Sequence, residues 1–355
     1  MVKRAALPLI LVLGLAWTAQ SSAAIPIDGP QLAFNRQRAH FPRHLDSLKN
    51  FSNLRLKSDL VTSGPFGEQA ERLLRTRLPG APFLSGGPAW SADGATLALT
   101  LITHAKYEDA TDIYVVNRDG SGLRAVTQFG DVDRPVFSID GGSLYFSRPA
   151  SRGRSAIWAV KADGTGARQL TPLVRGESSP SSVSPTNGDI ALSRTICTEG
   201  IPFPAPIKCR SSVGLLSPAT GVLMPLVQRA TDAAFSPDGM RIAYVSQRDD
   251  VTSVFPDKDK EPIGDLYVLD LATGQRVRLT KTKHASEATP SWDPSGQRLA
   301  FVRNKARSSR LVEINGDGTC ETALPREPTR PRVHFFYDGP TWQPGPGREA
   351  GRIAC

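Results

Sequence analysis

Apolar and polar residues alternate in short stretches that recur along most of the chain. Each stretch begins a few residues after a Gly turn. A second apolar stretch follows it and ends at another Gly turn, as DIYVVNRDG and DLYVLDLATG do. Short alternating stretches between Gly turns are typical of antiparallel strands joined in hairpins. In all but one copy, the first stretch places a small residue between two large ones. The copies are Leu97-Ala98-Leu99, Leu144-Tyr145-Phe146, Ile190-Ala191-Leu192, Ile242-Ala243-Tyr244 and Leu299-Ala300-Phe301.

One aromatic position recurs about every 50 residues and marks the first strand of each repeat. It stands before a polar turn in motifs such as PAWSADG (88 to 94) and AAFSPDG (233 to 239). We call it the anchor; its six occupants are Trp90, Phe137, Val183, Phe235, Trp292 and Trp342. With the three strands that follow, each repeat has four strands, which is the signature of a β-propeller blade.

The two ends of the chain together supply one further repeat. IDGPQLAF (27 to 34) holds a turn and a second strand with no first strand before it, whereas PTWQP (340 to 344) is a first strand with none after it. DLVTSGPFG (59 to 67) and ERLLRT fit the third and fourth strands, which leaves 35–58 as an insertion. We therefore expect an all-β, six-bladed propeller of four-stranded antiparallel blades. The C-terminal first strand pairs with the N-terminal strands and removes the open edges.

The expected domain organisation is a removable leader followed by one propeller domain, 25–355. Its blades cover about 88–127, 135–171, 180–226, 233–280 and 290–324, with a closing blade formed by 340–345 and 27–76. In the leader, 1–24, Lys3 and Arg4 precede an apolar run that ends in small residues, as in a secretory signal peptide. The run is short for a membrane span, so we expect a periplasmic or secreted protein without a transmembrane anchor.

The repeats resemble the WD-like repeat family typified by the propeller of the periplasmic protein TolB. AFSPDGMRIAYVSQRD, followed by DLYVLDLATGQRVRLT, is the most specific stretch, and the similarity covers nearly all of the expected mature chain. The resemblance implies a propeller that contacts proteins in the cell envelope. TolB-type proteins also carry an N-terminal α/β domain, and no segment of this chain corresponds to it.

Charge and cysteine content narrow the expected partners. Removing Lys3 and Arg4 lowers the formal net charge from +9 to +7. The basic residues are scattered along the sequence, so nucleic-acid binding, which needs a localised basic footprint, is not expected. An even number of cysteines in an exported chain favours disulfides. We expect Cys197 to pair with Cys209 inside one loop, and Cys320 to pair with Cys355 and fasten the tail.

Connection lengths indicate which face of the propeller carries the function. If each first strand runs downward beside the channel, short ADG, PDG and ATG turns lie on the lower face. Longer connections then lie on the upper face, including 102–111, 194–211, 247–264, 281–289 and 325–339. Long loops on a rigid scaffold usually carry binding residues, so the upper face is the candidate site.

The upper-face candidates are histidines, acidic residues that precede first strands, and aromatics near the last one. They are His104, Tyr107, Asp133, Asp232, His284, Glu287, His334, Phe335, Phe336 and Asp338. Carboxylates and imidazoles around a channel mouth suit a divalent cation, with His284 and His334 as weak candidate ligands. The simpler interpretation is that these acidic residues cap turns, and no cofactor is expected. The aromatics form either a partner's anchor point or a plug between the last two blades.

Two functions remain open from the sequence. The favoured one is a monomeric binding scaffold for an envelope protein or peptide. The alternative is a metal-dependent propeller enzyme, a lyase, lactonase or hydrolase, with its site at the channel mouth. No nucleophile-elbow motif of the G-x-S-x-G type occurs in the chain.

Overall fold

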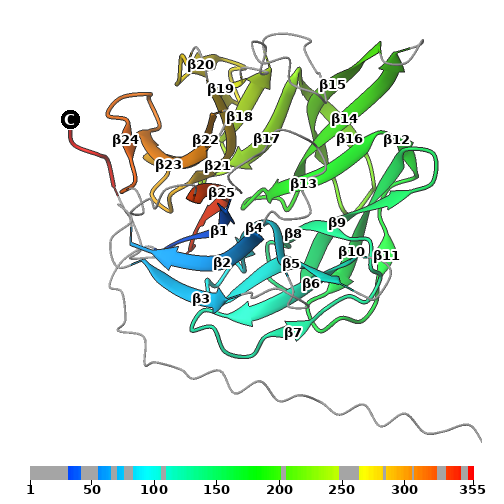
Figure 1. Cartoon of the computed structure of the whole chain (residues 1–355). Helices are drawn as coiled ribbons and strands as arrows, with labels where there is room; N and C mark the ends of the chain where they lie inside the picture. The colour runs from blue at the N-terminus through cyan, green and yellow to red at the C-terminus, as the bar shows by residue number, and fades with distance from the viewer. Residues whose placement is uncertain are drawn as a thin grey trace, which may run out of the picture.

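A computed structural model describes most of the chain, and it forms six sheets arranged around a central channel (Figure 1). The described residues are 31–40, 55–64, 70–75, 83–104, 109–200, 205–247, 264–282, 285–305, 308–325, 333–344 and 351–355. Each sheet runs from an innermost strand at the channel to an outer edge strand, with antiparallel neighbours. The predicted six-bladed propeller is therefore confirmed.

The first three blades follow chain order. Blade 1 contains β4 (Phe83–Trp90), β5 (Thr96–His104), β6 (Asp109–Asn117) and β7 (Arg124–Ala125). Blade 2 contains β8 (Asp133–Phe137), β9 (Ser143–Ala150), β10 (Arg154–Lys161), β11 (Arg168–Gln169) and the additional β12 (Val174–Arg175). Blade 3 contains β13 (Glu177–Val183), β14 (Ile190–Gly200), β15 (Ala205–Leu216) and β16 (Leu223–Gln228).

The remaining blades complete the ring. Blade 4 contains β17 (Ala230–Phe235), β18 (Arg241–Gln247), β19 (Gly264–Asp270) and β20 (Arg276–Arg278). Blade 5 contains β21 (Ser286–Trp292), β22 (Arg298–Lys305), β23 (Ser308–Asn315) and β24 (Thr322–Ala323). Blade 6 has the order β25 (Val333–Trp342), β1 (Leu32–His40), β2 (Arg55–Ser63) and β3 (Glu71–Arg75).

Blade 6 closes the ring by pairing the two ends of the chain. β1 lies antiparallel to β25, from Leu32 opposite Trp342 to His40 opposite Val333. At the channel, β25 also meets β4 of blade 1, where Gly339 and Gly87 lie so close that a Cβ on either would overlap the other. The predicted closure is confirmed, and it brings the first described strand into contact with the last.

The strands of blade 6 are longer than the sequence pattern predicts. The expected insertion 35–58 begins later, because β1 continues to His40 and β2 begins at Arg55. The polar stretch stays in the sheet because Arg36 and Arg38 both donate to Asp59 on β2, at 3.3 and 3.1 Å. The aromatic segment around Phe335, expected in a loop, likewise belongs to β25.

Blade 3 also replaces an expected loop with strands. β14 and β15 extend as one long hairpin through most of 194–211, and Cys197 lies directly opposite Cys209. Both predicted disulfides, Cys197–Cys209 and Cys320–Cys355, are present. The first therefore staples two paired strands and does not brace an irregular loop.

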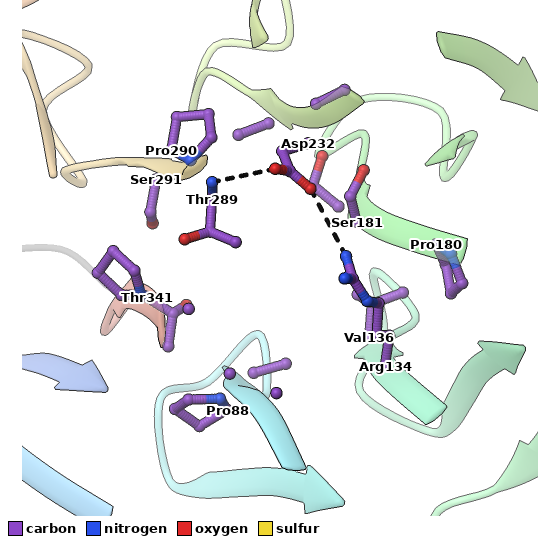
Figure 2. Close-up of a pocket in the computed structure, with 18 of the residues that line it drawn as sticks. Pro88, Arg134, Val136, Pro180, Ser181, Asp232, Thr289, Pro290, Ser291 and Thr341 are labelled. Carbon is purple, nitrogen blue, oxygen red and sulfur yellow. Dashed lines mark hydrogen bonds and ion pairs between the residues drawn. The ribbon is translucent and has the colours of Figure 1, made fainter. Parts of the chain in front are cut away.

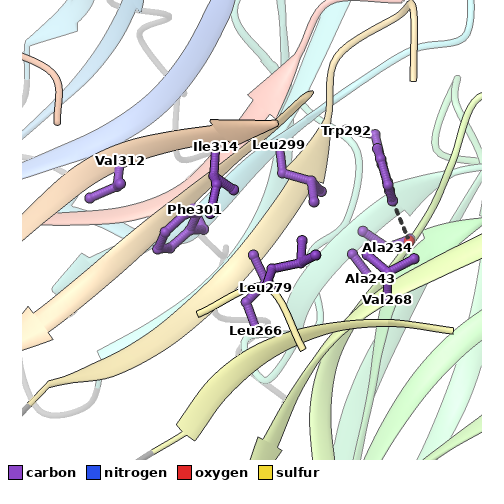
Figure 3. Close-up of a cluster of buried hydrophobic side chains, with 10 residues drawn as sticks. All are labelled: Ala234, Ala243, Leu266, Val268, Leu279, Trp292, Leu299, Phe301, Val312 and Ile314. Carbon is purple, nitrogen blue, oxygen red and sulfur yellow. Dashed lines mark hydrogen bonds between the residues drawn. The ribbon is translucent and has the colours of Figure 1, made fainter. Parts of the chain in front are cut away.

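The hydrophobic core lies between blades, and each joint is built on an anchor. In strand B, the second strand of each blade, the small central residue shares a buried cluster with the anchor of the following blade. Ala243 of blade 4 thus belongs to the cluster of Trp292 in blade 5 (Figure 3). Trp292 Nε1 donates to the Ala234 carbonyl of blade 4 at 3.2 Å. A small residue in strand B therefore leaves room for the next anchor. The pairs are Ala33–Trp90, Ala98–Phe137, Ala191–Phe235, Ala243–Trp292 and Ala300–Trp342.

A small residue in strand B is thus matched by a large anchor, and we call this matching of sizes the volume rule. The exceptional repeat follows the same rule with the two sizes exchanged. Blade 2 carries Tyr145 where the other blades carry alanine, and the following anchor is Val183, the smallest of the six. Both side chains pack against one cluster between blades 2 and 3. A large residue in strand B is therefore matched by a small anchor, and the joint keeps its volume.

The C-terminal tail is fastened to blade 5 by more than its disulfide. Asn315 exchanges two hydrogen bonds with the backbone of Ile353, at 3.0 and 2.8 Å, and the Ile353 side chain is buried. Arg352 pairs with Asp317 at 2.5 Å, and bonding to Thr319 and Arg352 lowers the pKa of Asp317 to about 2. The tail thus forms a polar and covalent clasp beside the closing blade.

The volume rule predicts a rescue. Val183→Trp should overpack the joint between blades 2 and 3 and lower the free energy of unfolding by about 1–3 kcal/mol. Adding Tyr145→Ala should recover part of that loss, measured by chemical denaturation. The control pairs Val183→Trp with Tyr114→Ala, which lies in another cluster and should be additive. An additive Tyr145 double variant would contradict the rule.

Ring closure predicts that the last strand is indispensable. Deleting 338–355 removes the anchor Trp342 and the pairing of β1 with the C-terminal half of β25. This leaves an open sheet edge. We expect an unfolded or self-associating product by light scattering and thermal unfolding. A shorter deletion, 351–355, removes only the clasp and should leave a folded monomer. A stable monomer after the longer deletion would refute closure by this strand.

Candidate functional site: the upper mouth of the channel

The innermost strands of all six blades line one central cavity. Its volume is about 210 Å³, and its walls come from β4, β8, β13, β17, β21 and β25 (Figure 2). Prolines from four blades, at the position two residues before the anchor, contribute to the wall: Pro88, Pro135, Pro290 and Pro340. Because proline lacks an N–H group and has a fixed φ, these positions give the channel a stiff wall.

A bulge interrupts the innermost strand of every blade. The pairing register of each one shifts just before the anchor. Arg134, Asp232 and Thr289, each three residues before its anchor, have φ of 53°, 52° and 46°. Positive φ is uncommon outside glycine and is an outlier for a β-branched residue such as threonine. Bulges of this kind redirect side chains, and here they set charged groups at the channel mouth.

Three carboxylates surround one guanidinium at this mouth. Arg134 Nη1 lies 3.5 Å from Asp232 Oδ1, and Arg134 Nε lies 3.8 Å from Asp133 Oδ2. Asp338 of the closing blade lies in the same cavity wall and interacts electrostatically with Arg134, Asp232 and Asp133. Three negative charges against one positive charge give this cluster, which we call the acidic mouth, a formal charge of −2.

Burial and neighbouring charges shift the pKa values of two groups in the acidic mouth, Asp338 and Arg134. Burial raises the pKa of the Asp338 carboxyl; Arg134 opposes this, while Asp232 and Asp133 add to it. Burial disfavours the charged form of Arg134, but attraction to Asp232, Asp133 and Asp338 outweighs it, so the pKa of Arg134 is raised. Arg134 is therefore held as a cation at this position. A second cation would further stabilise the ionised form of the Asp338 carboxyl.

Neighbouring blades fix the position of Asp232. Its backbone N–H donates to Ser193 Oγ of blade 3 at 2.9 Å, and its Oδ2 accepts from the Thr289 N–H of blade 5 at 3.4 Å. Figure 2 shows Asp232 between Arg134 and Thr289, with a contact to each. The carboxylate thus joins three blades at the channel and is held in place before any partner arrives.

The predicted acidic residues separate into two groups. Asp133, Asp232 and Asp338 meet at the mouth, whereas Glu287 is buried in blade 5, where Arg303 binds it at 3.0 Å and also binds Glu321. Burial raises the pKa of Glu287 despite the opposing effect of Arg303. Glu287 therefore lies in a buried ion pair of blade 5 and not in the channel wall.

The other predicted residues are placed in part. The backbones of His104, His334 and Phe336 belong to β5 and β25, while Tyr107, His284 and the side chains of those three lie outside the described residues. Phe335 is half-buried and lies opposite Arg38 in the pairing of β25 with β1. Within the described part of the chain, no three His, Cys, Asp or Glu side chains are placed to hold a metal ion.

Arg134 and Thr289 are not predicted from the sequence. Both stand in the column three residues before the anchor, which also contains Gly87, Pro180, Asp232 and Gly339. No single residue type is common to all six positions, so a motif search passes over them. Their common feature is the bulge.

The lower end of the channel has a different character. It opens into a hollow of about 440 Å³ that includes five of the anchors and four prolines. These are Trp90, Val183, Phe235, Trp292, Trp342, Pro185, Pro237, Pro294 and Pro344. The channel is therefore acidic at its upper end and apolar at its lower end. None of the described residues forms a helix long and apolar enough to cross a membrane.

Six four-stranded blades, closed by the chain ends around a channel, define this chain as a six-bladed β-propeller, and its fold resembles that of TolB propellers. It is similar to TolB from Acinetobacter baumannii, with a TM-score of 0.61 and 19% identity over 91% of this chain and 69% of that one. A putative TolB from Agrobacterium tumefaciens gives a TM-score of 0.53 and 18% identity over 83% and 89% of the two chains.

The fold similarity extends beyond TolB. Hydrazine synthase from Kuenenia stuttgartiensis gives a TM-score of 0.59 and 13% identity over 92% of this chain and 48% of that one. No family model matches the sequence. At these identities the similarities concern the fold, and the role of the acidic mouth depends on its own residues.

The acidic mouth predicts a pH-dependent gain from one substitution. Because the pKa of Asp338 is raised above its ordinary value of 3.8, its ionisation costs stability as the pH rises through the folded-state pKa. Asp338→Asn should therefore raise the thermal midpoint at neutral pH, and the gain should disappear under acidic conditions. Asp119→Asn is the control. A hydrogen bond from Ser121 lowers the pKa of Asp119, so this substitution should lower the thermal midpoint at neutral pH. A gain for Asp338→Asn that is independent of pH would contradict this account.

Proposed function

We propose that this chain is an exported binding scaffold that captures an envelope protein or peptide at the upper mouth of its channel. A basic group of the partner, a lysine or arginine side chain or a chain N-terminus, enters among Asp133, Asp232 and Asp338. The observation that carries the proposal is the charge of −2 at a fixed, partly buried position.

The size and stiffness of the cavity support an inserted side chain. A volume of about 210 Å³ is below the range of about 300–1,000 Å³ usual for small-molecule pockets. Bulged strand ends and prolines hold the wall in place, so a partner pays little to order it. The site therefore suits one side chain or chain end, with the rest of the partner lying on the upper face.

The charge distribution of the protein supports a positively charged group on the partner. The whole chain is basic, with a formal net charge of +9, yet the mouth is acidic. Attraction between the mouth and a basic group is strengthened by burial, because the surrounding protein screens charges less than water does. Export is supported by the leader pattern of residues 1–24 and by two disulfides, which persist in oxidising compartments.

Two substitutions with opposite effects test the proposal. Asp232→Asn should weaken capture of the partner by about tenfold or more, because it removes one carboxylate of the mouth. Arg134→Asn removes the internal cation and should strengthen capture. Asparagine tolerates the positive φ at both positions. The measurement is cross-linking in the envelope of the producing cell, with the adduct identified by mass spectrometry and its affinity then measured with purified proteins.

The matched control is Asp163→Asn, an exposed carboxylate in a lower-face turn, which should leave capture unchanged. If Arg134→Asn weakened capture and Asp232→Asn strengthened it, the mouth would recognise an anion and the proposal would be wrong. An adduct insensitive to both upper-face substitutions would also contradict it.

A further inference from the structure

Five arginines from separate segments gather at the upper ends of blades 2 and 3, outside the channel. Arg152, Arg175 and Arg210 are exposed, and Arg154 and Arg194 are half-buried. We call these five residues the arginine strip. They come from the β9–β10 connection, β10, β12, β14 and β15, on the right side of Figure 1. The scattered positions hide the cluster in the sequence.

Backbone contacts make the arginine strip continuous. Arg154 lies directly opposite Arg175 in the pairing of β10 with β12. The Arg194 guanidinium crosses from blade 3 to blade 2 and donates to the Arg175 carbonyl at 3.0 and 3.3 Å. Arg210 lies opposite Ile196, two residues along β14 from Arg194 and on the same face. Neighbouring strands lie about 5 Å apart, so successive guanidinium groups are close enough to act together.

The arginine strip carries an unneutralised charge. The segments 150–154, 174–178, 193–197 and 209–212 hold five arginines and a single carboxylate, Glu177, which gives a formal charge of +4. None of the five forms an ion pair with a carboxylate in the described part of the chain. Elsewhere in the propeller, Arg148, Arg278 and Arg303 are each paired with an acidic residue. The strip therefore holds a local excess of positive charge.

The chemistry of the arginine strip favours phosphate. The planar guanidinium binds phosphate oxygens through two parallel hydrogen bonds, and every cation of the strip is an arginine. No large exposed apolar side chain lies in these four segments, although Leu173 borders them. Protein interfaces usually have an apolar or aromatic centre, so the composition favours a polyanion over an acidic protein.

We propose that the arginine strip binds a linear polymer with repeated phosphate groups, such as a phosphate-bearing glycan or polyol of the envelope. The polymer lies across β10, β12, β14 and β15, and each phosphate contacts one or two arginines. This site is separate from the acidic mouth and has the opposite charge, so it does not depend on the function proposed above. It would hold the propeller against an anionic polymer while the channel faces its partner.

The test uses inorganic polyphosphate as the probe. In Arg175→Gln/Arg210→Gln both altered side chains are exposed and make no hydrogen bond or ion pair within the described residues, so the fold should be kept. The full-length mature protein should bind polyphosphate at low salt, and the double variant should bind about tenfold more weakly or worse. The slope of log affinity against log salt concentration should fall by about two. Fluorescence anisotropy measures both quantities.

Arg118→Gln/Arg168→Gln is the matched control. It removes the same charge from two exposed lower-side arginines and should bind polyphosphate nearly as the unmodified protein does. Equal weakening in both double variants would show that only net charge matters and would overturn the proposal. So would failure of the unmodified protein to bind polyphosphate at low salt. Stronger binding to polyglutamate, to anionic lipid vesicles or to duplex DNA than to polyphosphate would also overturn it, by assigning the strip to another class of partner.

Discussion

The joint between neighbouring blades is the constraint on which the rest of this structure depends. Each joint places an anchor, such as Trp292, over a small residue in strand B of the preceding blade, such as Ala243. The indole N–H of Trp292 and that of Trp90 each bond to a carbonyl of the preceding blade. Interiors are close-packed, so six matched joints around one ring fix the positions of the innermost strands. The geometry of the acidic mouth therefore depends on these joints.

Much of the fold could be predicted from the sequence, because the anchor repeat and the complementary chain ends each impose a strong pattern. Strand lengths could not, because a polar stretch such as 35–40 carries no alternation signal. It stays in the sheet through the contacts of Arg36 and Arg38 with Asp59. The sequence predicts a loop wherever partners distant along the chain satisfy polar side chains in a strand. Cys197 and Cys209 illustrate this, since their disulfide joins strands where the sequence indicates a loop.

The candidate site was only partly predictable for a related reason. Proximity to an inner strand identified Asp133, Asp232 and Asp338, but it also selected Glu287, which faces Arg303. The difference is one of position relative to the bulge: Asp133, Asp232 and Asp338 lie within the register shift or at its edge, whereas Glu287 lies outside it, and no residue type signals the bulge. Arg134 was missed for this reason. The structure shows an acidic channel mouth and a basic outer strip, two regions of opposite charge on one rigid ring.

Hydrogen exchange with mass spectrometry, with and without a short lysine-containing peptide from the cross-linked partner, tests the central claim most directly. Binding at the acidic mouth predicts slower exchange in the segments of β8, β17 and β25 that carry Asp133, Asp232 and Asp338. The lower turns at Asp93 and Asp238 should be unchanged. Protection confined to the lower turns, or spread evenly over all blades, would contradict binding at the upper mouth.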